Sequence, residues 1–219
     1  MAKRMSSAGE GEASRRAQRR AQHQQLSRTQ LLDAAEEMFG KRGFYETTLK
    51  EVAELAEFSV GSVYSFFADK EDLFLNVFIR RGEEFMPAMQ AAIEAGGSAL
   101  ERLHRLADFE VGYFREHPHF GRLYLRSFRI GAAAPVESSV AEALAGNFVS
   151  AMELQAEIFV RGQKEKILRS GDPVVLAHLF SGLIAAFQSI DPAVIEADPN
   201  SGERLPLAAL HEIIERAFT

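Results

Sequence analysis

The sequence predicts an all-α protein of about nine helices, and three observations lead to this fold class. No segment alternates convincingly between apolar and polar residues, which is the pattern of a half-buried strand. Apolar residues instead recur at the spacing of a helical face along most of the 219-residue chain. Glycine, proline and capping residues separate these stretches, as at Gly96-Gly97-Ser98 and Asp172-Pro173.

The composition limits the classes of protein that need to be considered. Apolar residues make up 47% of the chain, which is enough to bury a core in one large domain or two small ones. The absence of cysteine excludes disulfides and thiolate metal sites and suits a reducing compartment. The N-terminus is basic and polar without an apolar segment, so we expect no signal peptide and a cytoplasmic protein.

Charge is unevenly distributed along the chain, whose formal net charge is −6. Residues 1–30 carry seven Lys and Arg against two Glu, whereas residues 31–72 carry four basic against ten acidic residues. The total charge therefore gives no general affinity for nucleic acid, and the positive charge available to a polyanion lies in the N-terminal tail.

The N-terminal tail, residues 1–25, divides into two parts. Residues 1–13 are small, polar and glycine-bearing, and we expect them to be disordered. Ser14 to Gln25 consists of good helix formers, and a helix there would align four arginines as one basic stripe. These are Arg15, Arg16, Arg19 and Arg20. The stripe is either a DNA-contacting extension of the first helix or a solvated tail with only non-specific attraction.

Three helices are predicted between residues 27 and 67. The first covers Ser27 to Arg42 and ends at Gly43, which is a suitable C-cap glycine. Thr48 can cap a second helix, whose apolar residues recur on one face: Leu49, Val52, Leu55 and Ala56. Ser59 can cap a third helix that runs through Phe67.

The third of these helices has two contrasting sides. On a helical wheel of about 100° per residue, Val60, Val63 and Phe67 share one side. The opposite side carries Gly61, Ser62 and Ser65, flanked by Tyr64 and Phe66. A short helix with an apolar back and a small, hydrogen-bonding front fits the DNA major groove. We therefore interpret residues 47–74 as a helix-turn-helix and the start of the following helix.

The run from Ser59 to Phe74, SVGSVYSFFADKEDLF, resembles the recognition-helix signature of the TetR family of bacterial transcriptional regulators. The upstream run GFYETT, residues 43–48, resembles the same family's link between its first two helices. The resemblance covers residues 26–75. It departs from the family pattern at Glu57-Phe58, where a glycine and an aliphatic residue usually make the turn, so the turn is expected to be slightly altered.

The resemblance implies a domain plan and a function. Residues 26–72 would form the DNA-binding domain, and residues 73–219 a larger helical domain for ligand binding and dimerisation. The expected protein is a homodimeric, ligand-released repressor that binds double-stranded DNA at a palindromic operator. The alternatives are a helical adaptor that does not bind DNA and a small all-α enzyme, although the chain has no glycine-rich phosphate loop, HExxH or GxSxG motif.

The resemblance also assigns DNA contacts. Tyr64 and Lys70 correspond to the family's phosphate-binding tyrosine and lysine, and Thr48 to the residue whose hydroxyl and N–H meet the backbone phosphate. These residues could instead be a core aromatic, a solvated charge and a helix cap. Ser62 and Ser65 are candidates for base contacts, with Gly61 permitting close approach. The complete expected set is Thr48, Lys50, Ser59, Gly61, Ser62, Tyr64, Ser65 and Lys70, with Arg15, Arg16, Arg19, Arg20 and Arg28.

Six further helices are predicted after residue 69. They cover residues 70–95, 99–117, 120–130, 136–168, 173–190 and 206–218, with a turn at 117–119 and loops at 131–135 and 191–205. Pro87 should kink or end the first of them. The stretch 174–190 is apolar nearly all round, which implies burial on more than one side. It is short for a membrane span and contains polar residues, so we expect no membrane association and a homodimer through 173–190 and 206–218.

The middle helices carry many aromatic residues, most of which should be core. In a TetR-like protein the same bundle encloses a pocket for a small apolar or aromatic effector, with polar residues to orient it. The candidate pocket residues are Asp108, Phe109, Tyr113, Tyr124, Phe128, Asn147, Phe148, Gln155 and Phe159. His104 with Asp108, and His117 with His119, have metal-ligand spacing, but no third ligand recurs nearby, so we expect neither a metal nor another cofactor.

Overall fold

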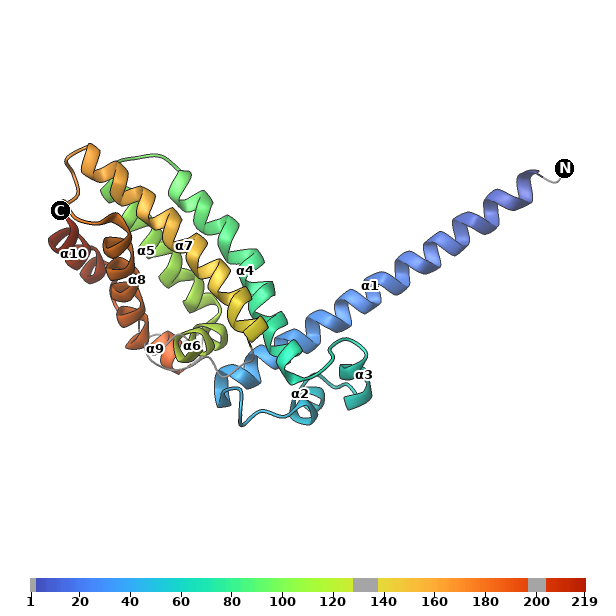
Figure 1. Ribbon diagram of the computed structural model, residues 1–219. Helices are drawn as coiled ribbons and strands as arrows, with labels where there is room; N and C mark the ends of the chain where they lie inside the picture. Colours follow the sequence, from blue (N-terminus) through green and yellow to red (C-terminus); the bar gives the residue numbers. More distant parts are fainter. Residues whose placement is uncertain (1–2, 128–137, 197–203) are drawn as a thin grey trace.

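The computed structural model describes residues 3–127, 138–196 and 204–219, which form ten helices and no strand. The all-α prediction is confirmed (Figure 1). The N-terminal helices are α1 (Lys3–Arg42), α2 (Leu49–Leu55), α3 (Val60–Tyr64) and α4 (Lys70–Glu94). The others are α5 (Ala99–Glu116), α6 (Pro118–Ser127), α7 (Ser138–Lys164), α8 (Pro173–Ser189), α9 (Pro192–Ile195) and α10 (Leu207–Phe218).

Helix α1 is a single helix of 40 residues, whose N-terminal half extends away from every other helix (Figure 1). It begins at Lys3, so the expectation of disorder over residues 1–13 is wrong for the helical residues. Alanine, glutamate, lysine and arginine in this segment favour helix, and adding turns to an existing helix avoids the cost of nucleation. The C-terminal half of α1 packs against α4 and α6.

The first three helices and the start of α4 enclose an aromatic core. Phe74 packs edge to face against Phe39 and Phe44, with ring centroids 5.2 and 5.0 Å apart. Val63 and Phe67 close the core from the α3 side. Gly43 ends α1 with φ +87°, a left-handed conformation that favours glycine. Residues 26–72, which the sequence predicts as the DNA-binding domain, are called the head below.

In the head, the end of one helix and the burial of one residue differ from the prediction. Helix α3 ends at Tyr64 instead of running through Phe67, because the Ser65 hydroxyl donates back to the Ser62 carbonyl at 2.6 Å and the chain then turns toward α4. Leu55, predicted on the buried face of α2, is 44% exposed, and Ala53 is buried in that helix together with Val52.

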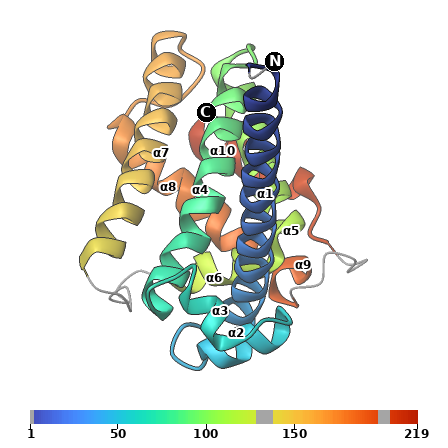
Figure 2. The same ribbon diagram turned by 90° about the vertical axis from the view of Figure 1, so that its right-hand side faces the viewer.

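The remaining helices form a bundle around α5, which contacts α4, α7, α8 and α10. Figure 2 shows α4, α5, α7, α8 and α10 together as one body above the α2–α3 end. Phe159, Phe180 and Phe218 meet in its core, with centroids 5.3–6.3 Å apart. A buried ion pair between Arg115 on α5 and Asp191 before α9 ties the end of α8 to the bundle at 2.5 Å.

Several boundaries in the bundle also differ from the prediction. Helix α4 continues through Pro87, whose exposed position leaves the freed carbonyl near water. Pro118 begins α6 instead of lying in a turn, since proline is favoured in a first helical turn. Helix α7 ends at Lys164, and Leu168 folds back against Gly162, where a Cβ atom would lie 2.4 Å from the leucine side chain. The four-residue α9 lies within the loop predicted at 191–205, and the loop predicted at 131–135 falls outside the described residues.

None of the helices in the described ranges combines the length and the apolar character that a membrane crossing requires.

Candidate functional site

The exposed side of α3 has the shape that its sequence predicted. Tyr64 is 57% exposed and Ser65 is exposed, whereas Val63 is fully buried. No charged residue occurs between Ser59 and Phe67. The surface is therefore small, polar and uncharged, with one projecting aromatic ring, which is compatible with entry into a major groove.

The serines of α3 are held by hydrogen bonds within the helix. Ser59 caps it by accepting from the Ser62 N–H at 3.0 Å, and the two hydroxyl groups lie 2.8 Å apart. The Ser65 hydroxyl donates to the Ser62 carbonyl. A Cβ atom on Gly61 would meet only the Ser59 hydroxyl, at 3.8 Å, so the Gly61 side is open. Ser62 and Ser65 still have acceptor capacity toward a base edge.

The turn between α2 and α3 has the geometry of a glycine-ended helix although no glycine is present. Glu57 has φ +60°, the left-handed conformation. Its N–H donates to the Glu54 carbonyl at 3.2 Å, and the Phe58 N–H donates to the Ala53 carbonyl at 2.8 Å, which together form a Schellman motif. The departure from the family pattern at Glu57-Phe58 therefore leaves the helix-ending hydrogen bonds in place, at a cost of about 1 kcal/mol for a non-glycine residue.

Three of the residues expected to contact DNA, Thr48, Lys70 and Lys50, differ in their surroundings. The Thr48 hydroxyl and N–H both donate to Glu51 in a capping box, so the cap and a phosphate would compete for these donors. The Lys70 Nζ lies 4.3 Å from the centre of the Phe44 ring, in cation–π contact. Lys50 is highly exposed and lies 3.7 Å from Glu54.

The arginines expected to bind DNA separate into two groups. Arg15, Arg16, Arg19 and Arg20 are exposed on the part of α1 that extends from the body. Arg28 instead points into the head, where it donates to Asn76 and lies 5.4 Å from the centre of the Phe67 ring.

Many acidic residues of the head are used in capping and ion pairing. Asp69 caps α4 by accepting from the Asp72 N–H, and Asp72 accepts from the Ala68 N–H. Glu51 pairs with Arg42, and its hydrogen bonds from Thr48 lower the pKa of its carboxyl group. Glu36 is buried between arginines of α4. These carboxylates thus serve the internal structure of the head, and none of them lies on α3.

The candidate effector residues do not form one group. Burial raises the pKa of Tyr124, and the nearby carboxylate of Glu110 raises it further. Gln155 donates a hydrogen bond to Glu110. Phe109 and Tyr113 stack with Phe85 instead. Asp108 pairs with His211 of α10, Phe148 contacts His178, and Phe159 is fully buried in the bundle core. Phe128 and the side chain of Asn147 fall outside the described residues.

Sequence reasoning missed the acidic residue at the centre of the bundle. Glu110 occupies the same stripe of α5 as Leu103, Leu106 and Phe114, which are all buried. Glu110 lies four residues after Leu106 and four residues before Phe114, so it is visible in the sequence as a break in the apolar face of the helix. Its partners Gln155 and Gln188 come from α7 and α8 and could not be assigned before the packing was known.

No group of three His, Asp or Glu side chains in the described ranges is arranged to hold a metal ion. The His104 and His211 rings stack with centroids 4.3 Å apart, and Asp108 lies 2.7 Å from His211. His117 instead contacts Arg81. His104 therefore lies in a contact between α5 and α10, whereas His117 lies in a contact with Arg81 of α4.

Comparison with known proteins agrees with this geometry. Residues 31–77 match the family described as bacterial regulatory proteins, tetR family. The chain is 29% identical over 162 residues to the HTH-type transcriptional regulator YhgD of Bacillus subtilis, a match that covers 71% of this chain and 79% of YhgD.

Two solved structures have the same fold. One is a transcriptional regulator from Saccharomonospora viridis in complex with choline, with a TM-score of 0.70, 18% identity and coverage of 89% of this chain and 98% of that one. The other is the regulator FadR from Bacillus subtilis in complex with stearoyl-CoA, with a TM-score of 0.66, 16% identity and coverage of 86% and 95%. All three proteins are named as transcriptional regulators. From the exposed recognition helix, the family match and these relatives, the chain is a DNA-binding transcriptional regulator of the TetR family.

Proposed function

We propose that this protein is a ligand-released repressor that acts in the cytoplasm and binds a palindromic operator as a homodimer. The observation that carries the proposal is the combination of an exposed, uncharged recognition helix with an exposed apolar surface at the other end of the molecule. The first can read one half-site, and the second can join two copies of the chain.

The dimer surface is formed by α8 and α10. Leu179 is 59% exposed and Ile213 47% exposed, and Val174 and Val175 are also more than half exposed. A groove of about 440 Å³ runs between the two helices, lined by apolar side chains that include Val175, Leu179 and Ile213. Exposed apolar residues clustered on two neighbouring helices are typical of an interface. This surface supports dimerisation through the ranges 173–190 and 206–218.

Two-fold symmetry gives the form of the operator. A symmetric dimer carries two copies of α3, which would enter major grooves separated by about 34–36 Å or a near multiple. Each half-site would then be read in the opposite direction from the other. A palindromic site follows from this arrangement.

Release by an effector requires that the ligand favours one of two states of the protein. A ligand among α5, α6, α7 and α8 would lie next to the seam between α6 and α1. At that seam a Cβ on Gly40 would lie 2.4 Å from the His119 carbonyl oxygen, so the two backbones are in direct contact. A ligand-dependent shift of α6 could therefore displace α1 and alter the spacing of the two heads.

The proposal is tested with the DNA upstream of the protein's own gene. Gel-shift titration should show tighter binding to this DNA than to a scrambled duplex. Sedimentation should show a dimer at micromolar concentration. A thermal-shift screen of apolar metabolites and drugs should then find a ligand that lowers DNA affinity. A monomer with no preference for any duplex would contradict the proposal and favour a helical adaptor.

A further inference from the structure

A cluster of polar side chains lies inside the helical bundle. Gln155 on α7 and Gln188 on α8 are both 2% exposed. Ser181 donates to Gln155 Oε1 at 2.9 Å, and Gln155 Nε2 donates to Glu110 Oε1 at 3.3 Å. Gln188 Nε2 donates to the Glu110 backbone carbonyl at 3.1 Å. Helices α7 and α8 thus direct neutral polar groups toward Glu110 on α5.

The carboxylate of Glu110 has few partners for a buried acid. Its one hydrogen bond, from Gln155, is long for a charged acceptor, which normally binds at about 2.7–2.9 Å. Among the described residues no Lys, Arg or His lies within ion-pair distance of it. A carboxylate has about four acceptor positions, so most of its capacity is unused.

This carboxylate is partly accessible. The Glu110 side chain keeps part of its accessible surface although its hydrogen-bond partner Gln155 is almost completely buried. Ser181 and Tyr124 likewise keep some surface. A polar group that is partly accessible can bind a ligand atom without displacing a protein partner.

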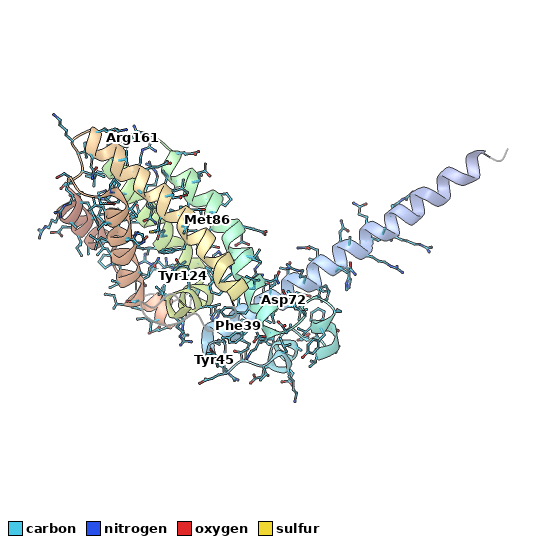
Figure 3. All side chains as sticks on the ribbon, viewed as in Figure 1. Phe39, Tyr45, Asp72, Met86, Tyr124 and Arg161 are labelled. Atoms are coloured by element: carbon cyan, nitrogen blue, oxygen red, sulfur yellow. The ribbon has the colours of Figure 1, made fainter. Side chains whose placement is uncertain are left out.

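The surroundings of Glu110 are apolar. Leu106 and Ala107 precede it in the core of the bundle, and Phe114 follows it in the core that includes the head. Tyr124 approaches from α6, and Figure 3 places Tyr124 toward the end of the bundle next to the head, opposite Arg161. A ligand here would contact both hydrophobic cores.

The protonation of Glu110 is affected by this environment. Burial raises the pKa of its carboxyl group to about 8. Tyr124 from α6 and Gln155 from α7 lie beside it, Gln188 from α8 contacts its backbone carbonyl, and Ser181 from α8 is linked to it through Gln155. None of these groups carries a positive charge. The site can therefore accept a cation that the protein itself does not supply.

We infer that the effector of this regulator is a small apolar amine, whose positively charged nitrogen is bound by the Glu110 carboxylate while its hydrocarbon part packs between the two cores. The inference rests on the proposed function, since it names the class of ligand that would release the repressor. An anionic ligand with its charged end at Glu110 is disfavoured, because one of the two neighbouring carboxyl groups would have to stay protonated.

Binding of amines to the full-length protein without DNA tests this inference separately from repressor release. Isothermal titration would compare octylamine with octanol and octanoate, and phenethylamine with phenethyl alcohol and phenylacetate. We expect each amine to bind at least tenfold more tightly than its alcohol, and the carboxylates to bind most weakly. Glu110→Gln should weaken amine binding by about tenfold or more and leave alcohol binding unchanged.

A matched variant and a second readout complete the experiment. Glu116→Gln removes an exposed carboxylate from the same helix and should leave amine affinity unchanged. Titration of the unmodified protein at neutral pH, in two buffers of different protonation enthalpy, should show proton release on amine binding, because the bound cation favours the ionised carboxylate. Amines that bind no better than alcohols, or that bind without proton release, would overturn the inference while leaving ligand-released repression open to the wider screen.

Discussion

Glu36 on α1 accepts two hydrogen bonds from Arg81 on α4, at 2.7 Å from Nε and 2.8 Å from Nη2. Arg80 donates to the same carboxylate at 2.8 Å. The three side chains are largely buried, and Arg81 also contacts Glu84 and His117. Burial by itself lowers the pKa of Arg81, but the hydrogen bonds and charge of Glu36 raise it above its usual value. This network joins the head to the bundle.

Removing the carboxylate from this network should strongly destabilise the protein. Glu36→Gln removes the buried counter-charge of two guanidinium groups, which then keep only the exposed carboxylates of Asp33 and Glu84. Breaking a buried ion pair in this way costs about 3–5 kcal/mol. Chemical denaturation of the variant would measure the loss. Glu37→Gln is the control, because the exposed pair between Glu37 and Lys41 contributes less than about 1 kcal/mol. Equal effects of the two substitutions would contradict the role of the buried network.

Contacts with phosphates and with bases should be separable in the head. Tyr64→Ala and Lys70→Ala should weaken binding to operator and to scrambled DNA by similar factors, about tenfold each, since phosphate contacts carry no sequence information. Ser62→Ala and Ser65→Ala should instead change the preferred sequence. Selection of binding sites from a random duplex library would measure both effects.

Lys70 needs a control for folding because it also packs on Phe44. Lys70→Gln keeps most of the side-chain volume and should reproduce the loss of DNA affinity without a fall in thermal stability. If Tyr64→Ala binds DNA as well as the parent protein, the phosphate contact carried over from the family is wrong.

The assembly prediction concerns Leu179 and Ile213. Leu179→Glu places a charge in the α8–α10 groove and should convert the dimer into a monomer, with loss of operator binding that exceeds the loss for a single half-site. Sedimentation equilibrium measures the state of assembly. Ile79→Glu, at an exposed apolar residue of α4, is the control and should leave a dimer. A dimer that survives both Leu179→Glu and Ile213→Glu would place the interface elsewhere.

The stability of the protein should depend on pH through Glu110. The raised pKa means that the folded state holds this proton more tightly than the unfolded state, so the contribution of Glu110 becomes less favourable as pH rises from about 4.5 to about 8. Glu110→Gln removes this ionisation. We expect the variant to be more stable than the parent protein by about 4 kcal/mol at pH 8 and little changed at pH 4. Denaturation at the two pH values measures the difference.

The local features of the head could be predicted from the sequence because they depend on near neighbours. Thr48, Ser59 and Asp69 cap helices as their residue types suggest, and Gly43 ends α1 in a left-handed conformation. The spacing of Val63 and Phe67 correctly identified the buried side of α3. Such features need only hydrogen bonds and side-chain periodicity within a few residues.

Features that depend on distant partners could not be predicted in the same way. Arg28 is predicted to contact DNA from its place in a basic segment, and the sequence gives no sign of its hydrogen bond to Asn76, which lies 48 residues further along the chain. Asp191 was assigned to a loop, whereas its side chain is fully buried against Arg115 of α5. Pairing across the bundle is set by tertiary packing, which one sequence does not reveal.

The last prediction concerns the helical N-terminal extension of α1. Phosphate neutralisation supplies much of the affinity of a protein for DNA, yet residues 31–72 carry a net charge of −6. Arg28 points inward, so the exposed set of Arg15, Arg16, Arg19 and Arg20 is the basic block nearest to the head along the chain. A rigid helix can hold these four side chains along a phosphate backbone or an adjacent minor groove.

Deleting residues 1–24 should therefore leave a folded dimer that binds DNA much more weakly. If four arginine–phosphate contacts are lost, the slope of log K against log salt concentration should flatten by about 3 to 4 units. Replacing only the four arginines by glutamine, which keeps the helix, should produce the same change, while the preferred DNA sequence should remain nearly the same unless the helix reads a narrow A/T-rich groove. Binding measured from low to moderate salt tests this. An unchanged slope in both variants would show that the extension makes no DNA contact.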